Sequence, residues 1–188
     1  MVFVLINGEA IYRLLKQKLR PDSTRDTTRE EIARNEDAER DELYRLFRND
    51  WLYYPRLGIE APIQWEVPQD QADDYLPHGL VHVLGTATPD INGDILITGH
   101  SSYYWWVEGD YKTILASLTE AQAGDVIVMR KGKIYFYEVS DIKEVSGEQA
   151  LDFVTMGKDK GDLYLVTCVP IGTDLRRLIV TAGFKKEI

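Results

Sequence analysis

The feature that most limits the fold of this chain is a series of short apolar runs, separated by turn residues, that begins at Trp51. The runs are rich in β-branched and aromatic residues, which is typical of strands joined by tight connections. Many short strands with few helices predict a mainly β domain, built as a barrel or a sandwich. The runs are WLYYPRLGI, APIQW, GLVHVLGTATP, GDILITGH, DVIVMRKGKIYFYEVSDIKEV, LYLVTCV and RRLIVTAGF.

Local signals place some of the connections. Asn92-Gly93 marks a turn before GDILITGH, and Lys131-Gly132 predicts the turn of a hairpin within residues 125–145. In the second strand of that hairpin, Ile134 and Phe136 alternate with Tyr135 and Tyr137, so the two pairs should face opposite sides. Residues 111–119 predict one short helix.

The first fifty residues have a different character. Residues 21–50 are dense in charge, with a capping-box pair and a small apolar stripe, so we expect a partly solvated helix there (Thr28 and Glu31; Leu43, Leu46 and Phe47). Upstream, apolar residues recur at helical spacing from Ile11 to Leu19. They fit either an amphipathic helix packed on the domain or the outer end of a membrane anchor. We expect a helical and linker segment at 1–50 and one β domain at 51–188.

Composition excludes several classes of function. The 188-residue chain carries a formal net charge of −9, so a nucleic-acid surface is not expected. Its single cysteine excludes an internal disulfide and any metal site made of several thiolates. We expect no metal and no cofactor.

That cysteine, Cys168, lies at the end of an apolar run, where it is either a small buried hydrophobe or a nucleophile. A nucleophilic thiol needs a nearby base, and the chain has three histidines. His78 lies in a polar stretch and is expected at the surface. His82 alternates with valines, so it is either a core residue or a wall of a site. His100 ends an apolar run after a glycine, which favours it as the partner of Cys168.

Two adjacent arginines, Arg176 and Arg177, follow the turn after Cys168. A guanidinium group presents a rigid fork of donors that suits a tetrahedral oxyanion. Adjacent strand residues point to opposite faces, so only one of the two can face the thiol.

These elements together resemble the sortase family, the cysteine transpeptidases of bacterial cell surfaces. The family pattern Thr-Leu-x-Thr-Cys is matched at Leu165, Thr167 and Cys168, with Tyr164 in the first position. CVPIGTDLRRLIV is similar to the family's Cys-x-Pro-x-Gly turn and its arginine strand. HGLVHVLGTATPDINGDILITGHSS and YYPRLGIEAPI resemble upstream family segments, so the resemblance covers roughly residues 51–184.

Departures from the family pattern lie in loops. Pro89-Asp90 stands where Pro-Gly is usual, and Ser101 stands where the residue after Gly-His is often Arg. The aromatic stretch SSYYWW is a less usual version of the segment that follows. These changes bear on substrate preference more than on the reaction.

The resemblance implies a closed barrel of about eight strands. It implies that Cys168 attacks a C-terminal sorting motif of a secreted protein and forms a thioacyl-enzyme, which an amine from cell wall or a pilin-type subunit resolves. His100 would protonate the departing amine and deprotonate the incoming one. Arg177, nine residues after Cys168, would stabilise the oxyanion, with Arg176 as the alternative. Thr167 would help form the oxyanion site, and His82 matches a recurring family histidine beside the site.

The family's substrate wall corresponds to the connection from Val145 to Gly161. Its apolar members would line the wall or form a short helix that caps the barrel (Ala150, Leu151, Phe153, Val154 and Met156). Trp105 and Trp106 would cover the groove or be buried against the N-terminal helix. The resemblance places the protein at the extracytoplasmic face of a bacterial membrane, with an N-terminal anchor as a possible attachment.

Two other functions compete with this one. An L,D-transpeptidase carries its His and Cys close together, whereas His100 and Cys168 are far apart in this sequence. A non-catalytic β-barrel binding module would bury Cys168 as an inert side chain.

Overall fold

Strands β1 to β8 close into a barrel in the order β1-β2-β3-β4-β7-β8-β6-β5 in the computed structural model, which describes residues 29–147 and 160–188. The β2–β3 and β4–β7 pairs are parallel and the others are antiparallel. The predicted mainly β barrel is confirmed. The strands are β1 (Trp51–Tyr54), β2 (Ile59–Val67), β3 (Leu80–Val83), β4 (Gly93–Thr98), β5 (Val126–Lys131), β6 (Lys133–Ser146), β7 (Lys160–Val169) and β8 (Arg176–Glu187).

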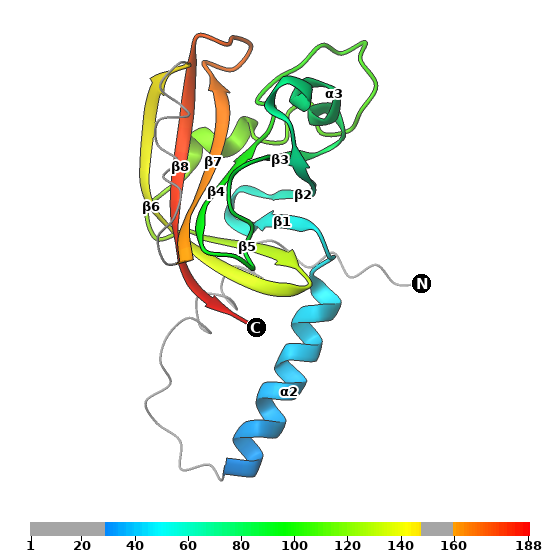
Figure 1. The fold of residues 1–188 in the computed structure, drawn as a ribbon, viewed down its shortest axis with the longest axis vertical. Coiled ribbons are helices and arrows are strands. Elements are labelled where there is room, and N and C mark those ends of the chain that lie inside the picture. The colour runs from blue at the N-terminus through cyan, green and yellow to red at the C-terminus, as the bar shows by residue number, and fades with distance from the viewer. Residues whose placement is uncertain (1–28, 148–159) are drawn as a thin grey trace.

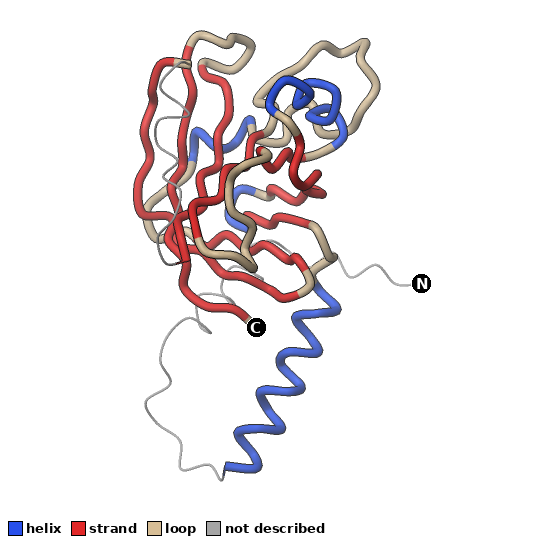
Figure 2. The backbone as a smooth tube through the Cα atoms, viewed as in Figure 1, coloured by secondary structure: helices blue, strands red, loops and turns tan. Residues whose placement is uncertain are grey.

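Helices contribute little to the barrel itself (Figures 1 and 2). The longest described helix, α2, extends from one end of the barrel, whereas α3 and the β7–β8 turn lie toward the other end (Figure 1). The helices are α2 (Arg29–Leu46), α3 (Ala72–Tyr75) and the 3₁₀ helices η1 (Pro55–Leu57), η2 (Gln69–Gln71), η3 (Leu76–His78) and η4 (Ala116–Glu120).

The predicted helix at 111–119 forms only in part. Residues 112–115 make turns, and the 3₁₀ helix η4 follows them. Leu115 and Leu118 are both fully buried, and a spacing of three brings both side chains to one side of a 3₁₀ turn. Packing against the barrel therefore overrides the weak helical preference of this short segment.

The hairpin β5–β6 turns at Gly132, as the sequence predicts, with Lys131 opposite Lys133. Its two faces are both buried. Tyr135 and Tyr137 belong to the interior core, whereas Ile134 and Phe136 pack on the outside of the barrel under the end of α2. The α2 residues of that contact are Leu43 and Phe47. Each such buried side chain contributes about 1.5–3 kcal/mol.

The interior core is formed by alternate residues of all eight strands of the described barrel. It includes Leu52, Ala61, Ile63, Leu80, Ile95, Ile97, Ile127, Met129, Tyr135, Tyr137, Val139, Leu163, Leu165, Leu178, Val180 and Ala182. The expected N-terminal segment at residues 1–20 lies outside the described residues. No helix in the described ranges is both long enough and apolar enough to cross a bilayer.

A buried ion pair ties the start of the barrel to β5. The Asp125 carboxylate accepts hydrogen bonds from Tyr54 Oη at 2.6 Å, Arg56 Nε at 2.7 Å and the Gln122 backbone N–H at 2.9 Å. The Asp125 side chain is only 3% exposed, so the loss of its partners would leave a charge in a nonpolar setting.

We therefore expect Asp125→Ala to lower the free energy of unfolding by about 3 kcal/mol, because the Tyr54 hydroxyl, Arg56 Nε and the Gln122 N–H all lose their acceptor. Tyr54→Phe, which removes one donor and leaves the ion pair, should cost about 1–2 kcal/mol. Guanidinium unfolding followed by circular dichroism measures both. Equal losses in the two variants would contradict this ranking.

Candidate active site

Cys168 and Arg177 lie directly opposite each other on neighbouring antiparallel strands, β7 and β8. Residues in direct register share one face of a sheet, with Cβ atoms about 4.5–5.5 Å apart. Arg176 is opposite Val169 instead, so its side chain belongs to the other face. The alternation of the strand thus selects Arg177 as the arginine that shares a face with the thiol.

His100 follows β4, which is the neighbour of β7 on its other side. Thr98 is in register with Val166, 68 residues later, and the Thr98 hydroxyl donates to the Val166 carbonyl at 3.0 Å. The same offset of 68 residues continues past the strand end, where the Thr167 hydroxyl donates to the Gly99 carbonyl. It brings His100 level with Cys168. The register therefore sets His100, Cys168 and Arg177 in one row across β4, β7 and β8.

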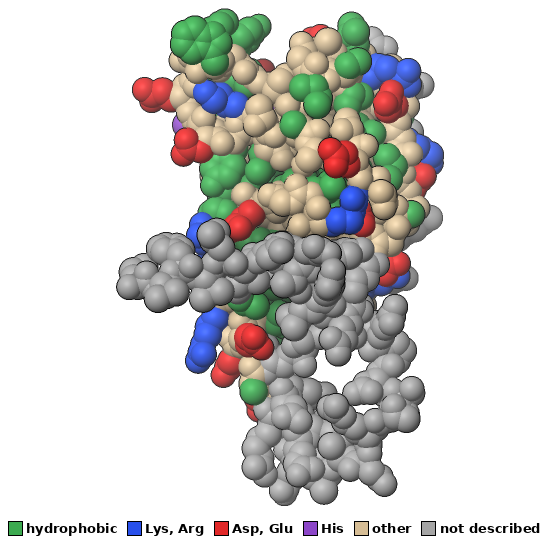
Figure 3. All heavy atoms as spheres, turned by 180° about the vertical axis from the view of Figure 1, so that it is seen from behind, with side chains coloured by type: hydrophobic (Ala, Val, Ile, Leu, Met, Phe, Trp, Pro, Cys, Tyr) green, Lys and Arg blue, Asp and Glu red, His purple; other side chains and the backbone are tan. Residues whose placement is uncertain are grey.

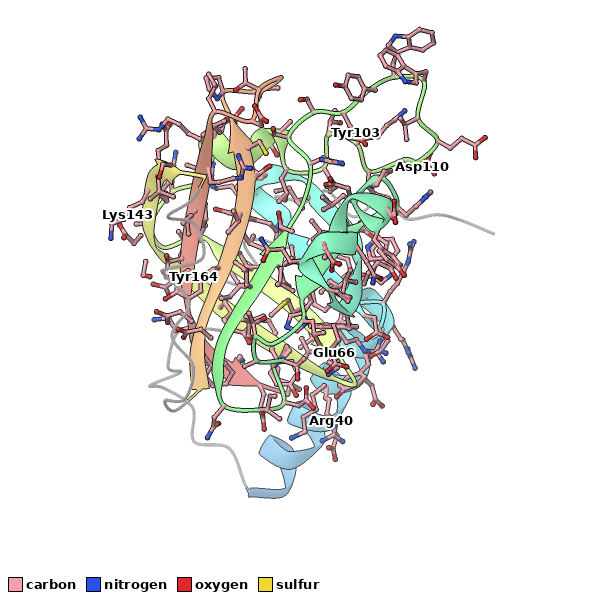
Figure 4. All side chains as sticks on the ribbon, turned by 45° about the horizontal axis from the view of Figure 1, so that its top comes forward. Arg40, Glu66, Tyr103, Asp110, Lys143 and Tyr164 are labelled. Carbon is pink, nitrogen blue, oxygen red and sulfur yellow. The ribbon has the colours of Figure 1, made fainter. Side chains whose placement is uncertain are left out.

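The face that carries Cys168 is the outer face of the barrel. Cys168 is partly exposed and alternates with Leu165 and Val169 of the interior core. Beside it runs an outer apolar strip, defined by Val83, Leu96, Val145, Val166 and Ile179, with Tyr164 against it. Figure 4 labels Tyr164 on this part of the barrel. The five side chains of this strip are buried, between 2% and 9% exposed, so the strip forms a packed layer beside the thiol.

The glycine before His100 is required by space. A Cβ atom on Gly99 would lie 2.6 Å from Leu80 Cδ2 and 2.9 Å from Leu115 Cδ1. The Leu115 N–H also donates to the His100 carbonyl at 3.0 Å. Because the backbone is held this closely, the direction in which the imidazole leaves it is fixed by the core.

The His100 imidazole stacks on Tyr103, with ring centroids 4.2 Å apart and 17° between the planes. Its Nε2 atom is buried and has no hydrogen-bond partner among the described residues. Burial lowers the pKa of His100, and the negative charge of Asp73 opposes that shift. The resting imidazole is therefore neutral at pH 7, which is the form that can accept a proton.

The two guanidinium groups are held differently. Arg177 is partly exposed, and its Nη1 donates to the carbonyls of Asp174 at 2.8 Å and Arg176 at 3.3 Å. A Cβ on Gly147 would lie 3.8 Å from Arg177 Cζ, so this glycine borders the guanidinium plane. Arg176 instead donates from Nη2 to the Glu144 carbonyl at 3.2 Å and lies 3.6 Å from its carboxylate.

Thr167 does not face the thiol. Its side chain is 1% exposed, and its hydroxyl donates to the Gly99 carbonyl at 2.8 Å. Strand alternation sends that hydroxyl to the face opposite Cys168. The hydroxyl ties β7 to the residue that precedes His100. The expected part of Thr167 in an oxyanion site stays a prediction.

His82 is fully buried, and its position favours the structural interpretation of the two that the sequence left open. It lies opposite Ile97 of the interior core. Its Nδ1 accepts from the Glu66 N–H at 3.1 Å, and its Nε2 lies 2.8 Å from the Ala87 carbonyl. These two bonds require the neutral tautomer with the proton on Nε2, and they join β2, β3 and the loop after β3.

The remaining predicted substrate-wall residues, Leu151, Phe153 and Val154, lie outside the described residues. Sequence reasoning missed Tyr103 and Ser102 as parts of the site. Ser102 Oγ accepts from the Gly172 N–H at 2.9 Å, which joins the loop after His100 to the β7–β8 turn. The described residues contain no cluster of three or more His, Cys, Asp or Glu placed to hold a metal ion.

The buried histidines predict how stability depends on pH. Burial lowers the folded-state pKa of both His82 and His100, so the unfolded chain binds protons more readily below its histidine pKa of about 6.5. The free energy of unfolding should therefore fall as the pH decreases from 7 to 5. In His82→Gln, urea unfolding at several pH values should show a smaller slope in this window. An unchanged slope in His82→Gln would refute this account.

Known proteins share both the sequence pattern and the fold of this chain. Sortase D of Bacillus subtilis (strain 168) is 28% identical over 134 residues, which covers 69% of this chain and 60% of that protein. The chain thus spans 60% of the length of this relative. The fold is similar to that of sortase C-1 from Actinomyces oris, with a TM-score of 0.59, 23% identity and coverage of 94% and 95%. Sortase E1 from Streptomyces coelicolor, solved with a tripeptide in the active site, gives a TM-score of 0.59, 20% identity and coverage of 73% and 87%.

The model of the sortase domain family matches residues 52–184, which include the whole row formed by His100, Cys168 and Arg177. This match covers more than half of the chain and all but the last residues of the barrel. The chain therefore belongs to the sortase family.

Proposed function

We propose that this protein is a sortase-type cysteine transpeptidase that cleaves a C-terminal sorting motif and joins the new acyl end to an amine. The observation that carries the proposal is the rung that pairs Cys168 of β7 with Arg177 of β8, with His100 two residues beyond the end of β4, the other neighbour of β7. Nucleophile, base and oxyanion donor are the groups that acyl transfer through a thioester requires.

In the first half-reaction, Cys168 Sγ attacks the carbonyl carbon of the scissile amide as the neutral His100 imidazole takes the thiol proton. The tetrahedral oxyanion is stabilised by the Arg177 guanidinium. The C–N bond then breaks, and the imidazolium donates its proton to the departing amine. The product is a thioester between Cys168 and the N-terminal part of the substrate.

In the second half-reaction, an amine attacks the thioester carbonyl and loses a proton to His100. The C–S bond breaks, and the thiolate is reprotonated by the imidazolium. Water in place of the amine gives slow hydrolysis.

The proposed substrates are secreted proteins with a C-terminal sorting motif, and the proposed acceptors are amines of the cell wall or of pilin-type subunits. The proposal places residues 51–188 as the catalytic domain at the extracytoplasmic face of the membrane, with residues 1–50 as the connecting segment. That the solved sortase E1 contains a tripeptide in its active site supports a short peptide as donor.

The direct test is mass spectrometry of the full chain after incubation with a library of sorting-motif peptides, first without an amine and then with one. We expect a thioacyl adduct on Cys168, which disappears when the amine is added. Cys168→Ala should form no adduct and no product. If no peptide labels Cys168 and thiol reagents react with it slowly, the chain is a binding module with an inert cysteine.

The adjacent arginines provide a matched pair of variants. Arg177→Ala should lower the rate of adduct formation by about 10²–10³-fold, because it removes the oxyanion donor on the thiol's face. Arg176→Ala, which changes the same residue type on the opposite face, should reduce the rate less than about threefold, as expected of an exposed pair. Stopped-flow acylation with the best peptide measures both. The reverse order would assign the role to Arg176.

A further inference from the structure

The loop after His100 carries a row of aromatic rings that starts at the catalytic histidine and ends in solvent. His100 stacks on Tyr103, whose ring centroid lies 5.3 Å from that of Tyr104. Tyr104 stacks on Trp106 at 4.7 Å, and Trp106 meets Trp105 edge-on at 5.7 Å. The last three are 58%, 63% and 83% exposed in the order Tyr104, Trp106, Trp105. We call the residues Tyr103–Trp106 the aromatic row.

The aromatic row is held in place by its own loop. Lys112 Nζ donates to the carbonyls of Trp105 at 3.2 Å and Val107 at 2.9 Å. Gly109 fits against η3, where a Cβ would lie 2.3 Å from the Pro77 carbonyl oxygen. The Tyr111 N–H bonds the same oxygen at 3.1 Å. Large aromatic side chains that a fixed backbone keeps exposed to solvent indicate a binding surface.

The charges around the aromatic row are negative. Glu108 and Asp110 are exposed on the same loop, and the negative charge of Asp73 on α3 acts on His100, where it opposes the lowering of the pKa by burial. None of these three carboxylates forms an ion pair with a described residue. The loop's own cation, Lys112, is already bound to carbonyl oxygens. Figure 4 labels Tyr103 and Asp110 on the loop that follows β4 and leads to η4, and Figure 3 shows hydrophobic side chains gathered at this end of the molecule.

We propose that the aromatic row, with Glu108 and Asp110 at its rim, is the docking surface for the acceptor, and that it takes a primary ammonium on an alkyl stem, as in a lysine side chain of a polypeptide. This inference rests on the proposed function, because it assigns the partner of the second half-reaction. Aromatic faces attract an ammonium ion, and their apolar surface covers an alkyl stem. Carboxylates at the rim favour a cation and disfavour an anionic lipid surface, as does the net charge of −9.

The position of the row gives the acceptor a defined route. Its inner end is the ring that stacks on the imidazole, so an amine that moves along the row arrives at the proposed base. A peptide amine is mostly protonated at pH 7 and must lose a proton before it attacks the thioester. The surface binds the ammonium form at its outer end, and the neutral His100 takes the proton at its inner end.

Binding is tested without any turnover. In the full-length Cys168→Ala protein, the indole N–H signals of the four tryptophans are followed by NMR during titration with Nα-acetyl-lysine methylamide. We expect the Trp105 and Trp106 signals to shift, whereas those of Trp51 and Trp65 stay in place. Nα-acetyl-norleucine methylamide, which has the stem without the ammonium, should shift them far less. Equal shifts with both probes, or shifts only with phosphatidylcholine vesicles, would overturn the proposal.

Turnover then separates the acceptor from the donor. The double variant Trp105→Ala/Trp106→Ala should form the thioacyl adduct at the wild-type rate, while its KM for the lysine probe rises about tenfold, as expected when two cation–π contacts are lost. Glu108→Gln/Asp110→Asn should raise the same KM and weaken its salt dependence. The matched control is Ile91→Ala. Ile91 is an exposed apolar residue just before the start of β4, whereas the aromatic row follows the end of β4.

Two outcomes of the turnover experiment refute the inference. One is an unchanged KM for the amine in the tryptophan variant, and the other is slower acylation, which would assign the row to the donor peptide. A wild-type chain that forms no adduct refutes the proposed function instead, and the NMR titration then decides the binding surface by itself.

Discussion

The register between β4, β7 and β8 is the constraint on which the site depends. Cys168 and Arg177 come from two strands joined by one turn, whereas His100 comes from a segment 68 residues before Cys168. Backbone ladders position these groups: the pair of Cys168 and Arg177 is one rung of an antiparallel ladder, and the parallel ladder of β4 and β7 fixes the level of His100. A slip of one residue in either ladder would turn a group to the wrong face.

Tethers outside the ladders complete the arrangement around the imidazole. The Thr167 hydroxyl binds the Gly99 carbonyl from inside the barrel, and Ser102 binds the β7–β8 turn from outside. The tight fit of Gly99 between Leu80 and Leu115 adds a steric limit. The interior core thus acts on the chemistry through backbone position, although none of its side chains reaches the outer face.

The sequence was informative wherever the argument depended on strand alternation, and it failed where that rule was not applied or where distant segments meet. Alternation showed that only one of Arg176 and Arg177 can face the thiol, while the spacing from Cys168 in the resembled pattern favoured Arg177. The same rule, applied to Thr167, would have placed its hydroxyl opposite the thiol. His82 remained ambiguous in sequence because β3 is buried on both faces, so its neighbours could not indicate its side. The stack of Tyr103 on His100 left no local signal, since it depends on the path of a loop tied to η3. The wall residues Leu151, Phe153 and Val154 remain predictions.

Cys168 and Arg177 lie on paired strands, whereas His100 lies in the loop after β4, and this difference affects local unfolding around the site. Segments beyond a strand end open at lower free energy than paired strands. Cys168 and Arg177 are one rung of the β7–β8 ladder, so strand pairing itself keeps thiol and guanidinium together. His100 lies beyond the end of β4, so its distance from the thiol depends on the hydrogen bonds that Thr167, Leu115 and Gly172 make to Gly99, His100 and Ser102. A change that breaks these few bonds would separate base from nucleophile without breaking a rung of the barrel.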